Sequence, residues 1–160
     1  YDERAGAHFT SRDIIYLMTE LLIAPEKEKI TAEGCTKTAY DMAMGTSQML
    51  GCLTERLQDV SSDATLTCFG QEFNPETYAI AKADMLIKGG NASGMKYGDT
   101  LSDDAFSGYE FDYVISIILT PILMSILSSE NAQRFNQSKT YFTLDLLIGW
   151  HSTLLRVSRP

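Results

Sequence analysis

The stretch FGQEFNPETYAIAKADMLIKGG (residues 69–90) continues as NASGMKYGDTLSDDAFSGYEFDYVIS (residues 91–116), and together they decide the fold. Two runs that favour β-strands end in this stretch at an acidic residue, first Glu72 and then Asp99. In an open sheet built from alternating strands and helices, ligands bind at the carboxyl ends of the strands. An acid at that edge can accept hydrogen bonds from a ribose or an exocyclic amine.

A helix is predicted between these two strands. Asn74-Pro75-Glu76 is typical of a helix start, with Asn as the N-cap and Pro in the first turn. Lys88-Gly89-Gly90 is typical of a helix end. The helical period predicts that Lys82 faces outward and that the buried face holds Tyr78, Ala81, Met85 and Leu86.

The rest of the chain supplies further elements of both kinds. The following ranges are predicted as strands: 36–40, which is followed by Asp41; 64–70; 94–97, which is followed closely by Asp99; and the almost entirely apolar 111–119.

Further helices are predicted on both sides of these strands. A capping box from Thr10 to Asp13 predicts a helix that ends before Pro25 and buries Ile14, Ile15, Met18, Leu21 and Leu22. A second helix is predicted from about residue 48 to 57, burying Met49, Leu50, Leu53 and Leu57. A surface loop is expected over 24–34 and a polar turn over 58–63. The C-terminal residues 140–157 have helical spacing, which predicts a helix burying Phe142, Leu146, Ile148, Trp150 and Leu154.

Strands that alternate with helices predict a three-layer α/β domain with a mostly parallel sheet. A length of 160 residues fits one such domain, residues 1–160. The abrupt start without an initiator Met suggests a piece of a longer chain. The longest apolar run, residues 113–127, is too short for a membrane span and contains Pro121, so a buried strand is predicted there and no membrane association is expected.

Charge and cysteine content restrict the possible partners. The formal net charge is −8, which does not favour direct binding to a DNA phosphate backbone. Three cysteines without a CxxC pair indicate a reducing cytoplasm rather than a disulfide framework. With only two histidines, no zinc-binding pattern is present.

Two enzyme classes fit the sequence poorly. A nicotinamide enzyme would have a GxGxxG motif after the first strand, and none occurs there. A serine hydrolase would have a nucleophile elbow, and residues 45–49 lack its second Gly.

Three segments resemble a known family: GQEFNPETYAIAKADMLIKG (70–89), GDTLSDDAF (98–106) and FDYVIS (111–116). They resemble the modification subunit of type I restriction–modification systems, which are S-adenosylmethionine-dependent DNA adenine-N6 methyltransferases. The resemblance implies a Rossmann-like methyltransferase core and S-adenosyl-L-methionine as cofactor. It also implies that DNA is reached through a specificity subunit, together with a second modification subunit and a restriction subunit.

The resemblance also implies cofactor-binding residues near the N-terminus and after the first strand. The N-terminal stretch, which in the family lies against the methionine end of the cofactor, comprises His8, Phe9, Thr10, Ser11 and Arg12. A plain capped surface helix is the alternative there. The loop after the first strand corresponds to Asp-Pro-Ala-Cys-Gly-Thr-Gly-Gly in the family, and its implied contacts are Asp41, Gly45, Thr46, Ser47 and Gln48. Ser47 and Gln48 replace the last two glycines of that pattern, and Gln48 adds bulk beside the cofactor.

The two acids at strand ends have implied roles as well. The family position of Glu72 binds the ribose hydroxyls, and that of Asp99 lies near the adenine amine. A solvated strand cap is the alternative for Glu72, and an Asx-type turn for Asp99.

The family's catalytic Asn-Pro-Pro-Phe follows the Asp-Tyr-Val-Ile-Ser segment, but here the residues are Ile117, Ile118, Leu119 and Thr120. None offers a side-chain acceptor to an adenine amine in the manner of Asn, so the catalytic residues cannot be assigned and a plain buried strand is predicted. Two functions therefore stay open: a DNA adenine-N6 methyltransferase, or an inactive Rossmann-like module that serves a structural or partner-binding role.

Overall fold

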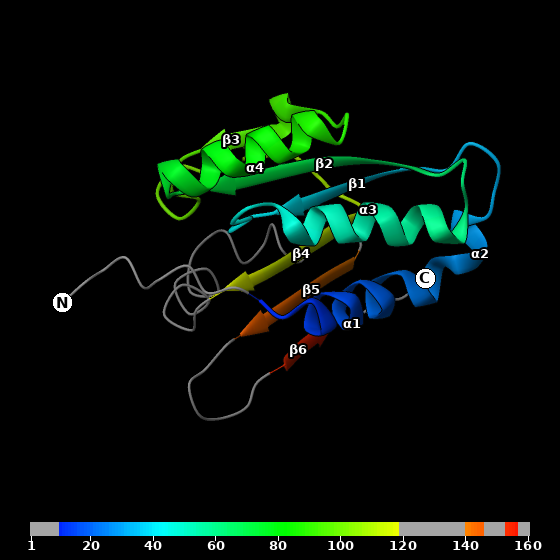
Figure 1. Cartoon of the computed structure of the whole chain (residues 1–160). Helices are drawn as coiled ribbons and strands as arrows, with labels where there is room; N and C mark the ends of the chain where they lie inside the picture. The colour runs from blue at the N-terminus through cyan, green and yellow to red at the C-terminus, as the bar shows by residue number, and fades with distance from the viewer. Residues whose placement is uncertain (1–9, 119–139, 146–152, 157–160) are drawn as a thin grey trace.

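The computed structural model describes residues 10–118 and the backbone of two further strands, 140–145 and 153–156. Its centre is a six-stranded sheet in the order β3-β2-β1-β4-β5-β6 (Figure 1). The strands are β1 (Thr36–Asp41), β2 (Thr65–Glu72), β3 (Met95–Tyr97), β4 (Tyr113–Ile118), β5 (Thr140–Asp145) and β6 (Thr153–Arg156). The first five are parallel to their neighbours, and β6 is antiparallel to β5. The predicted α/β fold with a mostly parallel sheet is confirmed.

The strand order reverses between β1 and β4. From β1 the chain moves outward through β2 to β3, and it then returns to place β4 on the other side of β1. Connections leave neighbouring strands in opposite directions at such a point, so a crevice forms outside their carboxyl ends. Asp41 and Ser116 lie on these two strands, beside that point.

The C-terminal prediction is wrong. In place of a helix over 140–157, the structure has β5 and β6 at its two ends. Residues 140–145 read Thr-Tyr-Phe-Thr-Leu-Asp, a run rich in β-branched and aromatic residues. This run pairs with β4 along its whole length, from Tyr113 opposite Thr140 to Ile118 opposite Asp145. Pairing with the open edge of β4 therefore makes this segment a strand, although the local spacing of its apolar residues favours a helix.

Alternation along the strands separates two apolar clusters. Ala39, Cys68 and Ile115 belong to the large core that also holds α1 (Arg12–Ile23), α3 (Gln48–Val60) and α4 (Pro75–Ile87). Their neighbours in sequence, Tyr40, Phe69 and Val114, point to the opposite face, because successive side chains of a strand alternate. There they pack against Phe106 and Phe111, which come from the loop between β3 and β4. Among the described residues, the three long helices thus cover one face and an aromatic loop covers the other; the helices of the third predicted layer are not among them.

The first helix starts one residue later than the capping box predicts. Ser11 occupies the N-cap position and makes no side-chain capping bond. Its carbonyl oxygen instead accepts from the amides of Ile14 and Ile15. With the cap at Ser11, the third helical residue is Ile14 rather than Asp13, so the predicted reciprocal pair cannot form.

The burial prediction for α1 holds for Ile15, Met18 and Leu22, whereas Ile14 is half-buried and Leu21 is exposed. The loop predicted over 24–34 contains two short helical segments, η2 (Ala24–Glu26) and α2 (Lys27–Ile30), which bury Ile30. Helix α3 continues to Val60, beyond the predicted end at 57, and buries Met49, Leu50, Leu53 and Leu57 as predicted.

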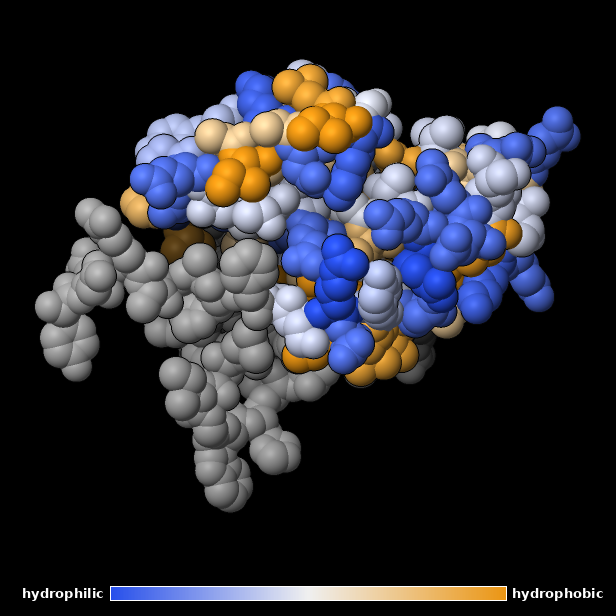
Figure 2. All heavy atoms as spheres, viewed as in Figure 1, coloured by the Kyte–Doolittle hydropathy of each residue, from blue (hydrophilic) through white to orange (hydrophobic). Residues whose placement is uncertain are grey.

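Helix α4 has the predicted bounds and caps. The Asn74 side chain accepts from the amides of Glu76 and Thr77, and Gly89 ends the helix with a φ of +72°. Ala81 and Met85 are buried as predicted, but Leu86 is 62% exposed. Ile80 and Ile87 of the same helix are exposed as well. Figure 2 shows apolar side chains gathered at the top of the molecule, where α4 lies in Figure 1. Leu86 and Met85 are adjacent in sequence, and a helix that lies on the edge of a sheet buries only one of two such neighbours.

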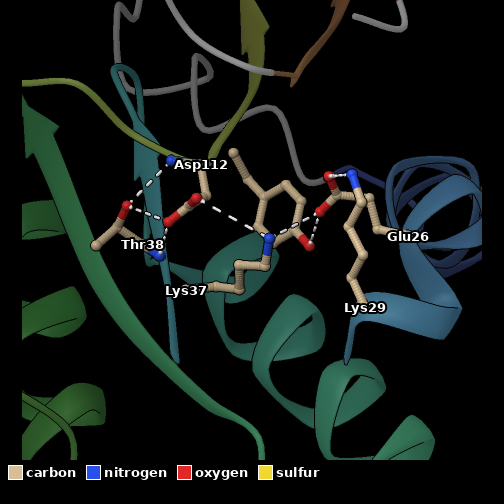
Figure 3. Close-up of polar contacts among 6 residues, drawn as sticks. Glu26, Lys29, Lys37, Thr38 and Asp112 are labelled. Atoms are coloured by element: carbon tan, nitrogen blue, oxygen red, sulfur yellow. Dashed lines mark hydrogen bonds and ion pairs between the residues drawn. The ribbon is translucent and has the colours of Figure 1, made fainter. Parts of the chain in front are cut away.

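A charged cluster closes the amino end of the sheet (Figure 3). Lys37 on β1 donates to Glu26 at 2.9 Å and lies 4.0 Å from Asp112, just before β4. Asp112 Oδ2 accepts from both the amide and the hydroxyl of Thr38, and the Tyr113 hydroxyl donates to Glu26 at 2.9 Å. Burial opposes the charge of Glu26, but the hydrogen bonds from Lys37 and Tyr113 outweigh it and lower the Glu26 pKa.

Candidate functional site

The sheet brings the predicted acids to one edge. Asp41 is the last residue of β1 and Glu72 the last of β2, and the register pairs Asp41 with Gly70. Glu72 pairs in turn with Tyr97 on β3, two residues before Asp99. All three strands point the same way in Figure 1, so their carboxyl ends, and the loops that follow them, lie at the same edge. The parallel register thus brings Asp41, Glu72 and the loop that holds Asp99 to one edge, and the binding of a cofactor there stays a prediction.

The loop after β1 makes a tight left-handed turn into α3. Gly45 and Ser47 have φ values of +54° and +61°, in the region that favours glycine. The Ser47 amide donates to the carbonyl of Met44 at 2.8 Å, and the Met44 amide donates to the carbonyl of Gln71 at 3.1 Å. The turn is thus anchored on β2 and leads directly into the N-terminus of a helix of 13 residues.

Ser47 fits this turn poorly. Its side chain is 1% exposed, and its hydroxyl finds no partner among the described residues. A non-glycine residue with a left-handed backbone is strained, and a buried hydroxyl without a hydrogen bond costs free energy. The glycine that the family pattern predicts here would have neither problem. Gln48 follows at the start of α3 and is half-buried.

Glu72 forms hydrogen bonds with three segments: the loop after β1, the start of α4 and the loop after β3. One carboxylate oxygen accepts from the amide of Gly45 at 2.9 Å, and the other from the amide of Asn74, the N-cap of α4, at 2.8 Å. Its carbonyl oxygen accepts from the amide of Gly98 at 3.0 Å, which holds the loop after β3. A carboxylate oxygen can accept two hydrogen bonds, so each side-chain oxygen keeps capacity for a ligand hydroxyl.

Asp41 is deeply buried, and its predicted contact with a cofactor stays a prediction. It is 2% exposed, and one of its oxygens accepts from the Ser116 hydroxyl on β4 at 2.7 Å and from the Ala43 amide at 3.1 Å. Burial, together with the nearby charge of Glu72, raises the Asp41 pKa to about 7, although the two hydrogen bonds oppose the shift. In this geometry the side chain ties the loop after β1 to β4 across the switch point.

Asp99 forms the turn that was one of its two predicted roles. Its carboxylate accepts from the amide of Leu101 and the hydroxyl of Ser102, both at 3.0 Å. The next residue, Thr100, donates its hydroxyl to the carbonyl of Met42 at 2.7 Å. The loops after β1 and β3 are therefore bonded directly to each other. A ligand contact of Asp99 stays a prediction.

Sequence reasoning missed Gln71. Its side chain is 1% exposed; the amide nitrogen donates to the carbonyl of Asp103 at 2.8 Å, and the amide oxygen accepts from the amide of Ala105 at 2.9 Å. An amide side chain at the end of a buried strand was the available signal, since such a group must find hydrogen-bond partners inside the protein.

The remaining predicted residues are only partly described. His8 and Phe9 lie outside the described residues. Thr10 is half-buried, Ser11 and Arg12 are exposed, and α1 begins toward the carboxyl ends of β4 and β5 in Figure 1. Gly45 and Thr46 are half-buried in the loop before α3.

At the predicted catalytic position, Ile117 is half-buried and packs against the large core on the helix-covered face, and Ile118 ends β4. Leu119 and Thr120 lie outside the described residues. Ile117 thus lies in a strand as predicted, but it is half-buried rather than buried, and its lack of a catalytic role stays a prediction.

No group of side chains suited to hold a metal ion occurs in the described part of the chain. Within the same part, no helix is both long and apolar enough to cross a membrane.

Residues 1–118 match the N-6 DNA methylase family. The chain belongs to this family. It is 27% identical over 117 residues to the type I restriction enzyme HindI methylase subunit of Haemophilus influenzae, a match that covers 71% of this chain and 24% of that protein. The chain therefore spans about a quarter of the length of this relative.

The solved structures that are similar to this N-6 DNA methylase family member include the following two. The first is the type I restriction-modification system methyltransferase subunit of Streptococcus thermophilus, with a TM-score of 0.51 and 27% identity over 68% of this chain and 22% of that one. The second is a putative class I S-adenosylmethionine-dependent methyltransferase of Listeria monocytogenes, with a TM-score of 0.62 and 17% identity over 86% of this chain and 46% of that one. The second likeness supports the fold alone.

Proposed function

We propose that this chain is the cofactor-binding core of a type I modification methyltransferase and that it binds S-adenosyl-L-methionine at the carboxyl edge of its sheet. The observation that carries the proposal is Glu72, whose carboxylate is held by the amides of Gly45 and Asn74 between the two helix starts. Vicinal ribose hydroxyls are donors that match such a fixed pair of acceptors. When bound, the cofactor would supply an electrophilic methyl group.

The described residues fit such a ligand in part. Gly45, with a positive φ and open space beside its Cα, lets backbone approach the ligand closely. Glu72 would accept from the ribose, and Asp99 would lie near the adenine. The side chains of Ser47 and Gln48 occupy space that the two glycines of the family pattern would leave open. We therefore expect the affinity of this chain for the cofactor to be lower than that of an intact family member.

Calorimetric titration of the chain with S-adenosylmethionine and its demethylated product tests the proposal. Glu72→Ala should weaken binding by more than about tenfold, or about 1.4 kcal/mol. Glu33→Ala, which removes the same charge from an exposed loop before β1, should change nothing and serves as the control. Circular dichroism of both variants separates a lost contact from a lost fold. Equal affinities for the parent and the folded Glu72→Ala variant would refute the assignment.

The proposed substrate is adenine in DNA, reached with the help of a specificity subunit and accompanied by a second modification subunit and a restriction subunit. The net charge of −8 supports this division of roles, because the chain itself offers little to phosphate. The isolated chain should bind duplex DNA no more tightly than about 1 µM at physiological salt, as nonspecific binders do. Fluorescence anisotropy measures this, and tighter binding would show that no partner is needed to hold DNA.

Methyl transfer by this chain should be very weak. An adenine amine is a poor nucleophile until acceptors hold its hydrogens, and the residues at the family's catalytic position begin with Ile117 and Ile118. Loss of one such directed hydrogen bond costs about 10²–10³ in rate. Transfer of a radiolabelled methyl group to unmethylated DNA, with the specificity partner present, is the test. Replacing residues 117–120 by Asn-Pro-Pro-Phe should raise the rate, whereas parental turnover equal to that of an intact family member would refute the expectation.

The second candidate function, a non-catalytic partner-binding module, is favoured by the apolar side chain of Ile117. It predicts no methyl transfer by either the parent or the grafted variant, and calorimetry with S-adenosylmethionine or its demethylated product distinguishes it from the first function. That residues 1–160 form a single domain and that the protein works in the cytoplasm stay predictions; the three free cysteines support the latter.

A further inference from the structure

We infer that Gln71 is a positioning residue for adenine recognition: its buried side-chain amide holds the loop after β3 in the conformation that presents Asp99, and its main chain holds the loop after β1. The inference rests on the proposed function, since it assigns a role within the same cofactor site. It concerns a side chain that does not itself touch the ligand.

The side-chain contacts of Gln71 need an amide. Its nitrogen donates to the carbonyl of Asp103 at 2.8 Å, and its oxygen accepts from the amide of Ala105 at 2.9 Å. A carboxylate could satisfy only the second of these contacts, and an apolar side chain neither. Because Gln71 is 1% exposed, water cannot readily replace the lost partners. This position therefore requires the donor and the acceptor of the Gln amide, and a side chain of the same size that lacks either group cannot make both bonds.

The same residue reaches a second loop through its backbone. The Gln71 carbonyl accepts from the amide of Met44 at 3.1 Å, inside the turn that precedes α3. Thr100 closes the connection by donating to the carbonyl of Met42. Gln71 therefore couples the loop that would surround the methionine and ribose portions to the loop that would face the adenine.

The loop after β3 lies directly against this amide. A Cβ on Gly98 would approach the Gln71 amide nitrogen to 3.0 Å, and the φ of Gly98 is +148°. From Gly98 the chain passes to Asp99, whose carbonyl accepts from the amide of Asp103 at 2.9 Å. Asp103 is in turn the residue that Gln71 holds. The position of the Asp99 carboxylate is thus set at both ends of a short loop, by Gly98 and by Asp103.

This arrangement predicts a specific effect on ligand selectivity. A fixed carboxylate at Asp99 accepts from the 6-amino group of adenine and repels the 6-carbonyl oxygen of hypoxanthine. Small misplacements of a positioned group cost large factors, so a loop released from Gln71 should lose this discrimination before it loses overall binding. A merely structural role of Gln71 would lower the affinity for both bases equally.

The test compares affinities for S-adenosylhomocysteine and S-inosylhomocysteine by calorimetry. The parent should prefer the adenosine compound by about tenfold or more, the value of one well-placed hydrogen bond to a charged group. Gln71→Met, which keeps the length but loses both bonds, should bring the ratio close to one. Gln71→Glu, which keeps the acceptor for Ala105, should give an intermediate ratio. Gln58→Met, the same change at an exposed position of α3, is the matched control and should keep the parental ratio.

Each outcome decides the inference. A folded Gln71→Met variant with the parental ratio would overturn it while leaving the proposed cofactor site intact. If Gln71→Met does not fold, Gln71→Glu carries the test, and a parental ratio in that variant overturns the inference. A parent that binds neither compound overturns the proposed function and this inference together.

Discussion

The two ends of the sheet hold buried and half-buried acids in opposite ways. At the amino end, Glu26 and Asp112 share the ammonium group of Lys37, so negative charge meets positive charge (Figure 3). At the carboxyl end, the contacts of Asp41, Glu72 and Asp99 are with backbone amides and the hydroxyls of Ser116 and Ser102.

The difference separates the end that ion pairs hold together from the end at which we propose that the ligand binds. An ion pair in a half-buried position neutralises its members and ties three segments together. Amides and hydroxyls orient a carboxylate without neutralising it, and the acid can then attract further donors. This contrast is what a site for a ligand rich in hydroxyl and amine groups needs, and it is the reason why we place the ligand at the carboxyl edge. Four substitutions test the contrast.

The largest effect is expected at the amino end. Lys37→Met should destabilise the protein by roughly 3 kcal/mol, because it removes the one cation that Glu26 and Asp112 share while both acids stay largely shielded from water. Chemical denaturation at pH 7 measures the loss. Lys29→Met removes an exposed cation that lies 3.6 Å from Glu26 and should cost no more than about 0.5 kcal/mol. Similar losses of stability in the two variants would contradict the idea that Lys37, rather than Lys29, is the cation that stabilises the two acids.

Asp41 should make stability depend on pH in the sense opposite to Glu26. Burial raises the Asp41 pKa from 3.8 to about 7, so the native state binds more protons than the unfolded one between these values, and stability falls as the pH rises through that window. The lowered pKa of Glu26 acts in reverse: its contribution is present above pH 4.5 and is lost as the pH falls below it.

Asp41→Asn should therefore stabilise the protein at pH 8 by roughly 2 kcal/mol and should have little effect at pH 4. The shift of the Asp41 pKa sets an upper limit of about 4 kcal/mol on this gain. Unfolding curves from pH 4 to 8 measure this difference. Parallel stability profiles for the parent and the variant would show that Asp41 is not the acid responsible.

Ser47→Gly should stabilise the carboxyl end by roughly 1.5 kcal/mol, because it relieves a left-handed backbone and removes a buried hydroxyl without a partner. Thermal unfolding measures the gain, and calorimetry should show tighter binding of S-adenosylhomocysteine. Ser61→Gly, at the other end of α3 with a φ of −151°, is the control and should not stabilise. A loss of stability in Ser47→Gly would argue against strain in this turn.

The smallest effect concerns the start of α4. Asn74→Ala should cost about 1 kcal/mol, because the Asn74 side chain accepts from two amides of the first helical turn. Ser11→Ala, at an N-cap whose side chain makes no capping bond, should cost much less. Thermal denaturation compares them, and equal costs would show that the Ser11 side chain does stabilise the start of α1.

Local signals in the sequence were reliable where a residue acts on its own neighbours. Asn74, Pro75 and Gly89 set the bounds of α4 because caps and left-handed turns depend on the few residues around them. The strand ends at Asp41 and Glu72 were likewise predictable from the polar residue that terminates an apolar run. The reversal of strand order was not predicted, because no local pattern in the sequence shows which strands become neighbours.

The sequence by itself therefore determined the order of most elements, the acids at the strand ends and the departure from the family's catalytic motif. Only the tertiary structure decided that residues 140–145 are a strand, since the unpaired edge of β4 is not visible in their local pattern. It also decided that Asp41 is buried against Ser116, 75 residues away in the chain, and that Gln71 holds a loop through Asp103 and Ala105. Hydrogen bonds between distant segments depend on how the strands assemble, and no spacing in the sequence encodes them directly.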